Sequence, residues 1–337
     1  MSKKNKKYHS IRNNYQKKRR TKNWIKNKSN NVQLRYDNLQ KQIENSKKTI
    51  INYPSPQKFS FINNTDEVLT YFNDVRDYIK QKESVNLDIS DITELTPETI
   101  TLLMAKLSEK ESRKVVLHGN APKDPILKKM FVESGIYNFV NSRGRKQVSQ
   151  KNKLWKHSTN NEVRGEMTAE AIKACKELFK LKGINYDTDS LYNLLVEAMS
   201  NTMNHADGKI SNLDWWLYYY LDEENNTLKF SFIDLGIGIF KSASFDTYKN
   251  YMKHLYKGNL LLVKPFLEGK IISSRKTDNE ISGKGVQQII DCAKLDEFKK
   301  FIIISNDVKI DVKSQEGEEL SDNFEGTFIY FEISSNN

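Results

Sequence analysis

The sequence contains little cysteine: its two cysteines, Cys175 and Cys292, lie far apart among 337 residues. Neither belongs to a C-x-x-C pair or has a nearby histidine, so neither a disulfide framework nor a zinc site is indicated. The sequence also lacks any run of eighteen apolar residues, and its first residues lack the apolar segment of a signal peptide. We therefore expect a cytoplasmic protein that does not associate with a membrane.

The net charge of +11 is concentrated at the N-terminus. Residues 1–30 hold twelve lysines and arginines and no acidic residue, which leaves 42 basic residues against 43 acidic ones in the rest of the chain. Because aliphatic residues are few there, we predict that residues 1–31 form a disordered basic tail. Counterion release would give this tail affinity for RNA or DNA, and Tyr8, Tyr15 and Trp24 could stack on bases. A solubilising tail or a docking arm for an acidic protein is an equally open interpretation.

The length predicts about two domains. Residues 32–56 are interpreted as a connecting helix and linker, because apolar residues recur at helical spacing until the sequence YPSP interrupts them. Residues 57–140 alternate short strands with helices, which predicts a small α/β domain whose neighbouring strands are parallel. Residues 141–164 are polar and basic and are interpreted as a second linker, followed by a second domain over 165–337. The elements expected in the first domain are strand 84–90, helix 97–106, strand 114–119 and helix 125–134.

A helix expected over residues 191–206 carries a row of polar side chains. Glu197, Asn201 and His205 are spaced i, i+4 and i+8, so they lie on one side of the helix while leucine, alanine and methionine fill the rest. Burying a carboxylate and an amide without partners is costly. The row therefore indicates either a solvated surface or a binding site. His205 lies at the helix end, where it either packs, which we favour, or faces the site.

Two glycine motifs follow this helix. Residues 230–239 read FSFIDLGIGI, a strand that runs into Asp234, Gly236 and Gly238, and the preceding segment 214–221 is expected to pair with it as a hairpin. Residues 282–290 read SGKGVQQII, a glycine pair that opens a helix. Glycines at such positions let the backbone approach a planar base or a phosphate where a Cβ would block it.

The helix row, the DLGIGI sequence, the later SGKG sequence and a closing Gly326-Thr327 strand resemble, in this order, the GHKL superfamily of ATP-binding domains. The resemblance covers residues 165–333 and implies a two-layer α/β sandwich, with helices on a mixed, mainly antiparallel sheet, that binds ATP and Mg²⁺. It implies that Glu197 is the general base for the attacking water and that Asn201 is the metal ligand. It also implies that Asp234 accepts the exocyclic amine of adenine, with the hydroxyl of Thr327 beside it.

The same resemblance assigns further residues to nucleotide binding. Gly236 and Gly238 would pass close to the base, and Arg275, which follows an Ile-Ser-Ser sequence, would approach a phosphate. The remaining assigned residues open the second glycine helix toward the phosphates: Gly283, Lys284 and Gly285. The sequence departs from the family pattern at Val286-Gln287, where many relatives continue Leu-Gly, and this puts lid closure and the hydrolysis rate in doubt more than binding.

Within residues 57–140, the sequence LDIS at 87–90 and the sequence MFVESGI at 130–136 resemble STAS domains, the fold of anti-sigma-factor antagonists. That family places a phosphorylatable serine after an aspartate, whereas this chain has Thr96-Pro97-Glu98. No phosphoacceptor is in register, although Thr96 and Thr99 are near. The pattern therefore favours a structural or docking role over a phosphorylation switch.

Three functions follow from these patterns. The first is a regulatory Mg²⁺-dependent ATPase whose lid closure controls an unidentified protein partner or a homodimer contact. The second is a serine/threonine protein kinase of the anti-sigma-factor type, and the third is a nucleic-acid-binding or scaffold protein gated by nucleotide. Sensor histidine kinase activity is disfavoured because the sequence around His157, KHST, is not a phosphoacceptor helix pattern.

Overall fold

The computed structural model shows a mixed α/β fold. The residues it describes are 50–109, 112, 115–140, 153–158, 165–181, 183–184, 186–204, 214–242, 258–270 and 284–334. The predicted basic tail and most of the first connecting segment lie outside these residues. Across the described part of the chain, every helix is too short or too polar to cross a membrane.

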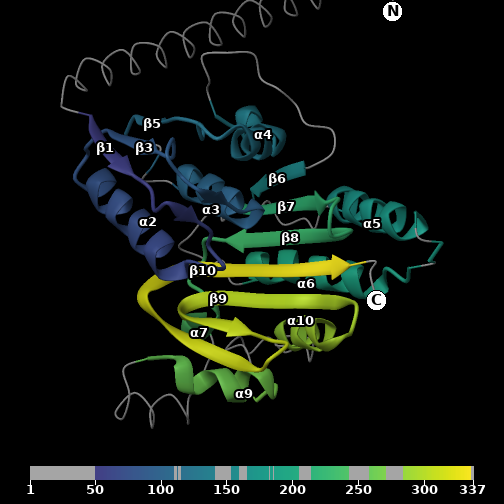
Figure 1. Cartoon of the computed structure of the whole chain (residues 1–337). Helices are drawn as coiled ribbons and strands as arrows, with labels where there is room; N and C mark the ends of the chain where they lie inside the picture. Colours follow the sequence, from purple (N-terminus) through teal and green to yellow (C-terminus); the bar gives the residue numbers. More distant parts are fainter. Residues whose placement is uncertain are drawn as a thin grey trace, which may run out of the picture.

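A five-stranded sheet forms the centre of the molecule (Figure 1). All of its strand pairs are antiparallel, so the mixed pairing that we expected is absent from the described strands. The hairpin predicted from the sequence is present. In spatial order the strands are β6 (Lys153–Ser158), β7 (Asp214–Asp222), β8 (Thr227–Asp234), β10 (Glu316–Ser334) and β9 (Phe298–Asp311).

The edge strand β6 corrects the sequence-based interpretation of residues 141–164, because it lies inside the segment that we interpreted as a linker. It pairs along its whole length with β7. Strand β9 is likewise one continuous strand, although the polar sequence SND at residues 305–307 follows its apolar residues. In both segments, polar residues obscured the strand pattern in the sequence, although the residues pair with a neighbouring strand in the structure.

Apolar side chains lie on both faces of this sheet. In β7, Trp215 and Leu217 pack on one face, whereas Trp216 and Tyr218 pack on the other. Side chains alternate along a strand, so an unbroken apolar run such as WWLYYYL is typical of a strand buried on both faces. Strand β7 is therefore covered on both faces, whereas the two-layer sandwich that we expected would cover only one.

Three helices cover the first face and are called here the helical layer: α5 (Gly165–Lys180), α6 (Asp189–Asn204) and α10 (Lys284–Lys294). Their amphipathic sequences place alanine, leucine and cysteine against the sheet. Shorter helical pieces lie beside this layer: α7 (Ile239–Ser242), η3 (Leu260–Leu262) and α9 (Val263–Leu267).

Residues 50–140 form the second covering layer, called here the N-terminal layer. Its parallel sheet has the order β1 (Ile51–Pro54), β3 (Val85–Asp88), β5 (Leu117–Gly119), and the parallel pairing of the two predicted strands is confirmed. Strand β1 was not expected, because the YPSP sequence indicated a break. The other elements are β2 (Lys58–Phe59), α2 (Thr65–Lys80), β4 (Glu94–Leu95), α3 (Pro97–Ser108), α4 (Pro125–Glu133) and η2 (Ile136–Asn138).

Helices α2 and α3 lie against the second face of the central sheet (Figure 1). The Thr101 hydroxyl on α3 is hydrogen-bonded to the Ser231 hydroxyl on β8 at 2.6 Å, and both residues are buried. The Trp216 indole N–H donates to the Ser108 hydroxyl at 3.1 Å. The central sheet is therefore the middle of three layers, and the two-layer sandwich expected for the C-terminal part has the N-terminal layer on its other face.

We predict that the N-terminal layer and the sheet unfold together, because they share one apolar core. Phe61 packs with ring centroids 5.7 Å from Phe324 and 5.0 Å from Phe328. Phe61→Ala should lower the free energy of unfolding by about 3–5 kcal/mol, measured as a single urea transition by tryptophan fluorescence, to which the buried Trp215 and Trp216 contribute. Ile126→Ala, at a side chain that is 75% exposed, is the control. Two separate transitions, with the tryptophan signal unmoved by Phe61→Ala, would contradict the shared core.

Candidate functional site

The polar row of α6 lies directly beneath the first turn of α10. A Cβ on Gly285 would come within 2.5 Å of the Glu197 carboxylate Oε2 and within 2.9 Å of the Asn201 amide Oδ1. Real Cβ atoms do not approach other atoms so closely, so a larger residue at position 285 would force the ends of these two side chains to move. The structure therefore brings together three residues that sequence analysis assigned to the site from two separate motifs.

Glu197 and Asn201 are both partly buried between the two helices. Burial raises the pKa of Glu197 above its ordinary value. Burial raises the pKa of the Cys292 thiol on α10 above its ordinary value. The negative charges of Glu297, Asp291 and Glu197 raise this pKa further, in decreasing order of effect. A partly desolvated carboxylate beside an amide oxygen has the chemistry needed to accept a proton and to bind a hard cation.

Asp234 ends β8 at the edge of the same layer. Its register partners are Trp215 on β7 and Thr327 on β10. Since side chains alternate along a strand, Asp234 faces the same side as Phe230 and Phe232, which pack against the helical layer. The Asp234 side chain therefore lies on the face of the sheet that α6 and α10 cover.

The Asp234 carboxylate is held by several donors. The Gly236 backbone N–H donates to its Oδ1 at 2.8 Å, and the hydroxyl and the backbone N–H of Thr327 donate as well. Burial outweighs these bonds and raises the pKa of Asp234 to about 6. At neutral pH the carboxylate is thus ionised but poorly solvated, which favours binding of a polar N–H donor.

Glycines allow close backbone approaches around this carboxylate. Gly238 has φ +84°, and a Cβ there would meet the Asn306 amide at 2.6 Å. Gly326 has φ +131°, and a Cβ there would lie 2.1 Å from the backbone carbonyl oxygen of Asp234. The strand that carries Thr327 can therefore pass next to Asp234 only because residue 326 is glycine. Gly236 is buried, and its role in the structure is the N–H that it donates.

Sequence analysis missed Ser305 and Asn306 on β9, which are both fully buried. The Ser305 hydroxyl accepts from the Ile239 N–H and donates to the Gly326 carbonyl, each at 2.8 Å. It thereby joins the turn after Asp234 to the strand that carries Thr327. The available signal was the polar pair itself, which interrupts the apolar sequence FIII.

The remaining predicted residues are not placed by the structure. His205, Arg275 and Gly283 lie outside the described residues, and for Lys284 only the backbone at the start of α10 is described. In the described ranges, no group of three or more histidine, cysteine, aspartate or glutamate side chains could hold a metal ion. The assignments of Arg275, Gly283 and Lys284 to phosphate binding stay predictions.

Comparison with known proteins does not add to this geometry. No protein-family model matches the chain, and no curated protein matches its sequence. The candidate site therefore depends on the positions of Glu197, Asn201, Gly285, Asp234 and Thr327.

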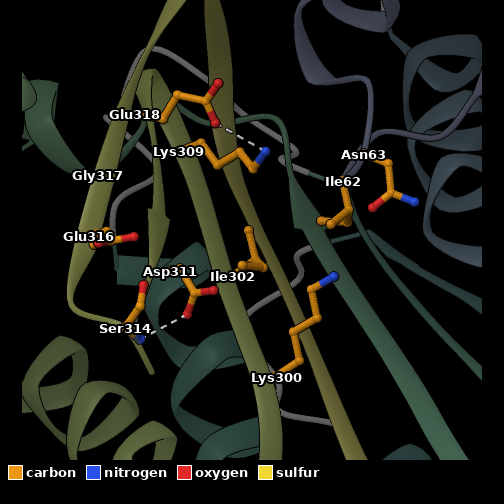
Figure 2. A pocket seen from close by; sticks show the side chains of 10 residues that line it. All are labelled: Ile62, Asn63, Lys300, Ile302, Lys309, Asp311, Ser314, Glu316, Gly317 and Glu318. Carbon is orange, nitrogen blue, oxygen red and sulfur yellow. Dashed lines mark hydrogen bonds and ion pairs between the residues drawn. The ribbon is translucent and has the colours of Figure 1, made fainter.

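A separate hollow of about 470 Å³ lies on the opposite face of the sheet. Figure 2 shows that it is lined by Lys300 and Ile302 of β9, by the turn at Ile62, and by Lys309 with its partner Glu318. Lys309 and Glu318 form an ion pair at 3.2 Å. Ile302 packs with the N-terminal layer, so this hollow is distinct from the site beside α6 and α10.

We predict that Gly285→Ala and Glu197→Ala are energetically coupled. At an unobstructed helical position, glycine to alanine stabilises a helix by about 1 kcal/mol, but here the added methyl group would displace the Glu197 carboxylate. Gly285→Ala should therefore lower the free energy of unfolding of the wild type. In the Glu197→Ala background, the same substitution should lower it by less or should raise it. The coupling free energy in a urea-unfolding double-mutant cycle should be about 1–2 kcal/mol.

Gly165→Ala is the matched control for this cycle, because a Cβ at Gly165 would meet no atom within 4 Å. It should show no coupling to Glu197→Ala. Strict additivity of Gly285→Ala and Glu197→Ala would show that the two helices do not meet in the way described.

The raised pKa of Asp234 predicts a pH-dependent stability penalty. An unfolded aspartate loses its proton near its ordinary pKa of 3.8, whereas folded Asp234 retains it up to about 6. Folded Asp234 therefore binds more protons between these values, so its contribution to stability falls as pH rises through this window and then levels off. Asp234→Asn lacks this loss. Its free energy of unfolding relative to wild type should rise by up to about 3 kcal/mol between pH 4 and pH 7, and a flat difference would refute the shift.

Proposed function

We propose that residues 165–337 form an ATP-binding domain of the GHKL type and that the protein is a regulatory Mg²⁺-dependent ATPase. The observation that carries the proposal is the contact of Gly285 on α10 with both Glu197 and Asn201 on α6. Three motif residues that are remote in sequence meet there, on the face of the sheet to which Asp234 and Thr327 also turn.

The assigned groups fit the chemistry of an adenine nucleotide. Asp234, ionised at neutral pH and oriented by Thr327 and the Gly236 N–H, would accept the exocyclic amine of adenine. A guanine base has an acceptor at the corresponding position, so this carboxylate would disfavour GTP. Because Asp234 already accepts hydrogen bonds from the protein, its orientation would need no reorganisation when a base binds.

The polar pair on α6 fits the phosphate end of the ligand. Asn201 offers an amide oxygen, which is a suitable ligand for a hard cation, and Glu197 offers a carboxylate of raised pKa that can orient and deprotonate a water. When bound, Mg²⁺ would neutralise charge that develops on the phosphates. The α10 backbone at Gly285 packs closely over Glu197 and Asn201. The peptide N–H groups at the N-terminus of a helix favour an anion, and α10 begins at this point.

The N-terminal layer supports a regulatory role. On α2, Asp66 accepts from the Ser321 N–H at 2.9 Å, the Thr70 hydroxyl donates to Asp322 at 2.9 Å, and Arg76 pairs with Glu325 at 3.2 Å. Residue 325 directly precedes Gly326 and Thr327 of the site. A partner or a second copy of the chain that shifts α2 could therefore alter the strand beside Asp234.

The start of α3 supports a structural role for the STAS-like region. Thr99 is fully buried and accepts from the Phe61 N–H at 2.7 Å, and the Thr96 hydroxyl donates to the buried carboxyl group of Glu98. Both hydroxyls are thus engaged inside the protein. This favours docking of the N-terminal layer on the sheet over a phosphorylation switch within that layer.

The proposal is tested by two substitutions on α6. Glu197→Ala should retain binding of a fluorescent ATP analogue but lower the rate of phosphate release by about 100-fold or more, because the base is lost. Asn201→Ala should bind the analogue equally with Mg²⁺ and with a chelator, because the metal ligand is lost. Asn193→Ala, at an exposed asparagine of the same helix, is the control. Wild-type turnover in Glu197→Ala would show that Glu197 is not the base, and a wild type that binds no ATP would refute the function.

A further inference from the structure

Asn306 is buried where the turn after Asp234 meets β9. It is fully inaccessible to solvent, and its backbone has φ +58°, in the left-handed region. Its amide Nδ2 donates to the Ile237 carbonyl at 3.0 Å, and its Oδ1 accepts from the Phe240 N–H at 3.0 Å and the Lys241 N–H at 3.3 Å. One side chain therefore bonds the backbone on both sides of Gly238.

The contact between Asn306 and Gly238 depends on the residue type at both positions. The position where Gly238 would carry a Cβ is filled by the Asn306 amide, with Nδ2 at 2.6 Å and Oδ1 at 2.7 Å. Asparagine is suited to this place because it combines a donor with an acceptor and tolerates the left-handed conformation better than most residues. Aspartate would keep the acceptor and lose the donor, and glycine would keep the backbone conformation and lose both.

The residues on either side of Asn306 hydrogen-bond further segments near the site. Ser305 bonds Ile239 in the turn and Gly326 on β10, and Asp307 accepts from the Asn259 N–H at 3.1 Å. Gly326 lies against the Asp234 carbonyl and precedes Thr327. The turn at Gly238 and the strand at Thr327 are thus both fixed to β9 beside Asp234.

We propose that Asn306 is a positioning residue that holds the 236–238 turn beside Asp234 and so sets the preference of the site for adenine over guanine. This inference rests on the proposed ATP-binding function. Asn306 acts through the backbone that it bonds, because its own donor and acceptor atoms are used within the protein. Without its amide, the backbone from Ile237 to Lys241 would lose three hydrogen bonds, Gly238 would lose its support, and the edge of the base site would widen.

The test is nucleotide binding by Asn306→Gly, which keeps the left-handed backbone and removes the side chain. Affinity for a fluorescent ATP analogue should fall about ten-fold or more, and the ratio of ATP to GTP affinity should fall with it. Asn306→Asp, which keeps the acceptor, should show a smaller loss of affinity and also a lower ratio. Asn226→Gly is the matched control, because Asn226 also has a positive φ, +48°, but lies in the β7–β8 turn; it should bind as the wild type does.

The outcomes separate this inference from the function on which it rests. If the wild type and Asn226→Gly bind no ATP, the proposed function fails and the inference fails with it. If the wild type binds ATP and Asp234→Ala does not, while both Asn306 variants keep the wild-type ratio of ATP to GTP affinity, the function stands and the inference is overturned. A lower melting temperature with an unchanged ratio would show a purely structural role. If Asn306→Gly does not fold, the ratio measured for Asn306→Asp decides.

Discussion

The central sheet is buried on both faces, and this constraint governs where polar chemistry can lie. Along β7 and β8 the side chains alternate between the helical layer and the N-terminal layer, so a polar side chain within either strand needs a partner, as Ser231 has in Thr101. Asp234 lies at the end of β8, where backbone N–H groups and a hydroxyl hydrogen-bond its buried carboxylate.

Close backbone approaches at three glycines then bring separate segments to one region. Gly285 brings α10 onto the polar pair of α6, Gly326 brings β10 onto the carbonyl of Asp234, and Gly238 makes room for the amide of Asn306. At Gly326 a side chain would meet the backbone of Asp234, whereas at Gly285 and Gly238 it would displace the ends of the Glu197, Asn201 and Asn306 side chains. The close contacts at the site therefore depend on glycine at these three positions.

The N-terminal layer is part of the same packed unit as the sheet. Its helix α2 bonds the segment of β10 that leads into Gly326, and β10 is irregular in its pairing with β9 between Glu319 and Thr327. Irregular pairing lets a strand change direction without breaking the sheet. The segment of β10 from Ser321 to Thr327 contacts α2 on one side and lies next to Asp234 on the other, so it connects the N-terminal layer to the candidate site. This connection is the physical basis of the regulatory role that we propose.

The sequence by itself determined the local features of this protein. Helical spacing placed Glu197 and Asn201 on one side of α6, and alternation of strands and helices predicted the parallel pairing of β3 and β5. Only the tertiary structure decided that Gly285 meets Glu197, that β6 joins the sheet, that residues 50–140 cover its second face, and that Asn306 supports Gly238. The spacing of apolar residues predicts which side of its own helix or strand a side chain lies on, whereas these contacts join elements that are remote in sequence. The sequence of a polar pair such as Ser305-Asn306 is the same whether the pair faces water or a neighbouring turn. Only the packed structure distinguishes these two environments.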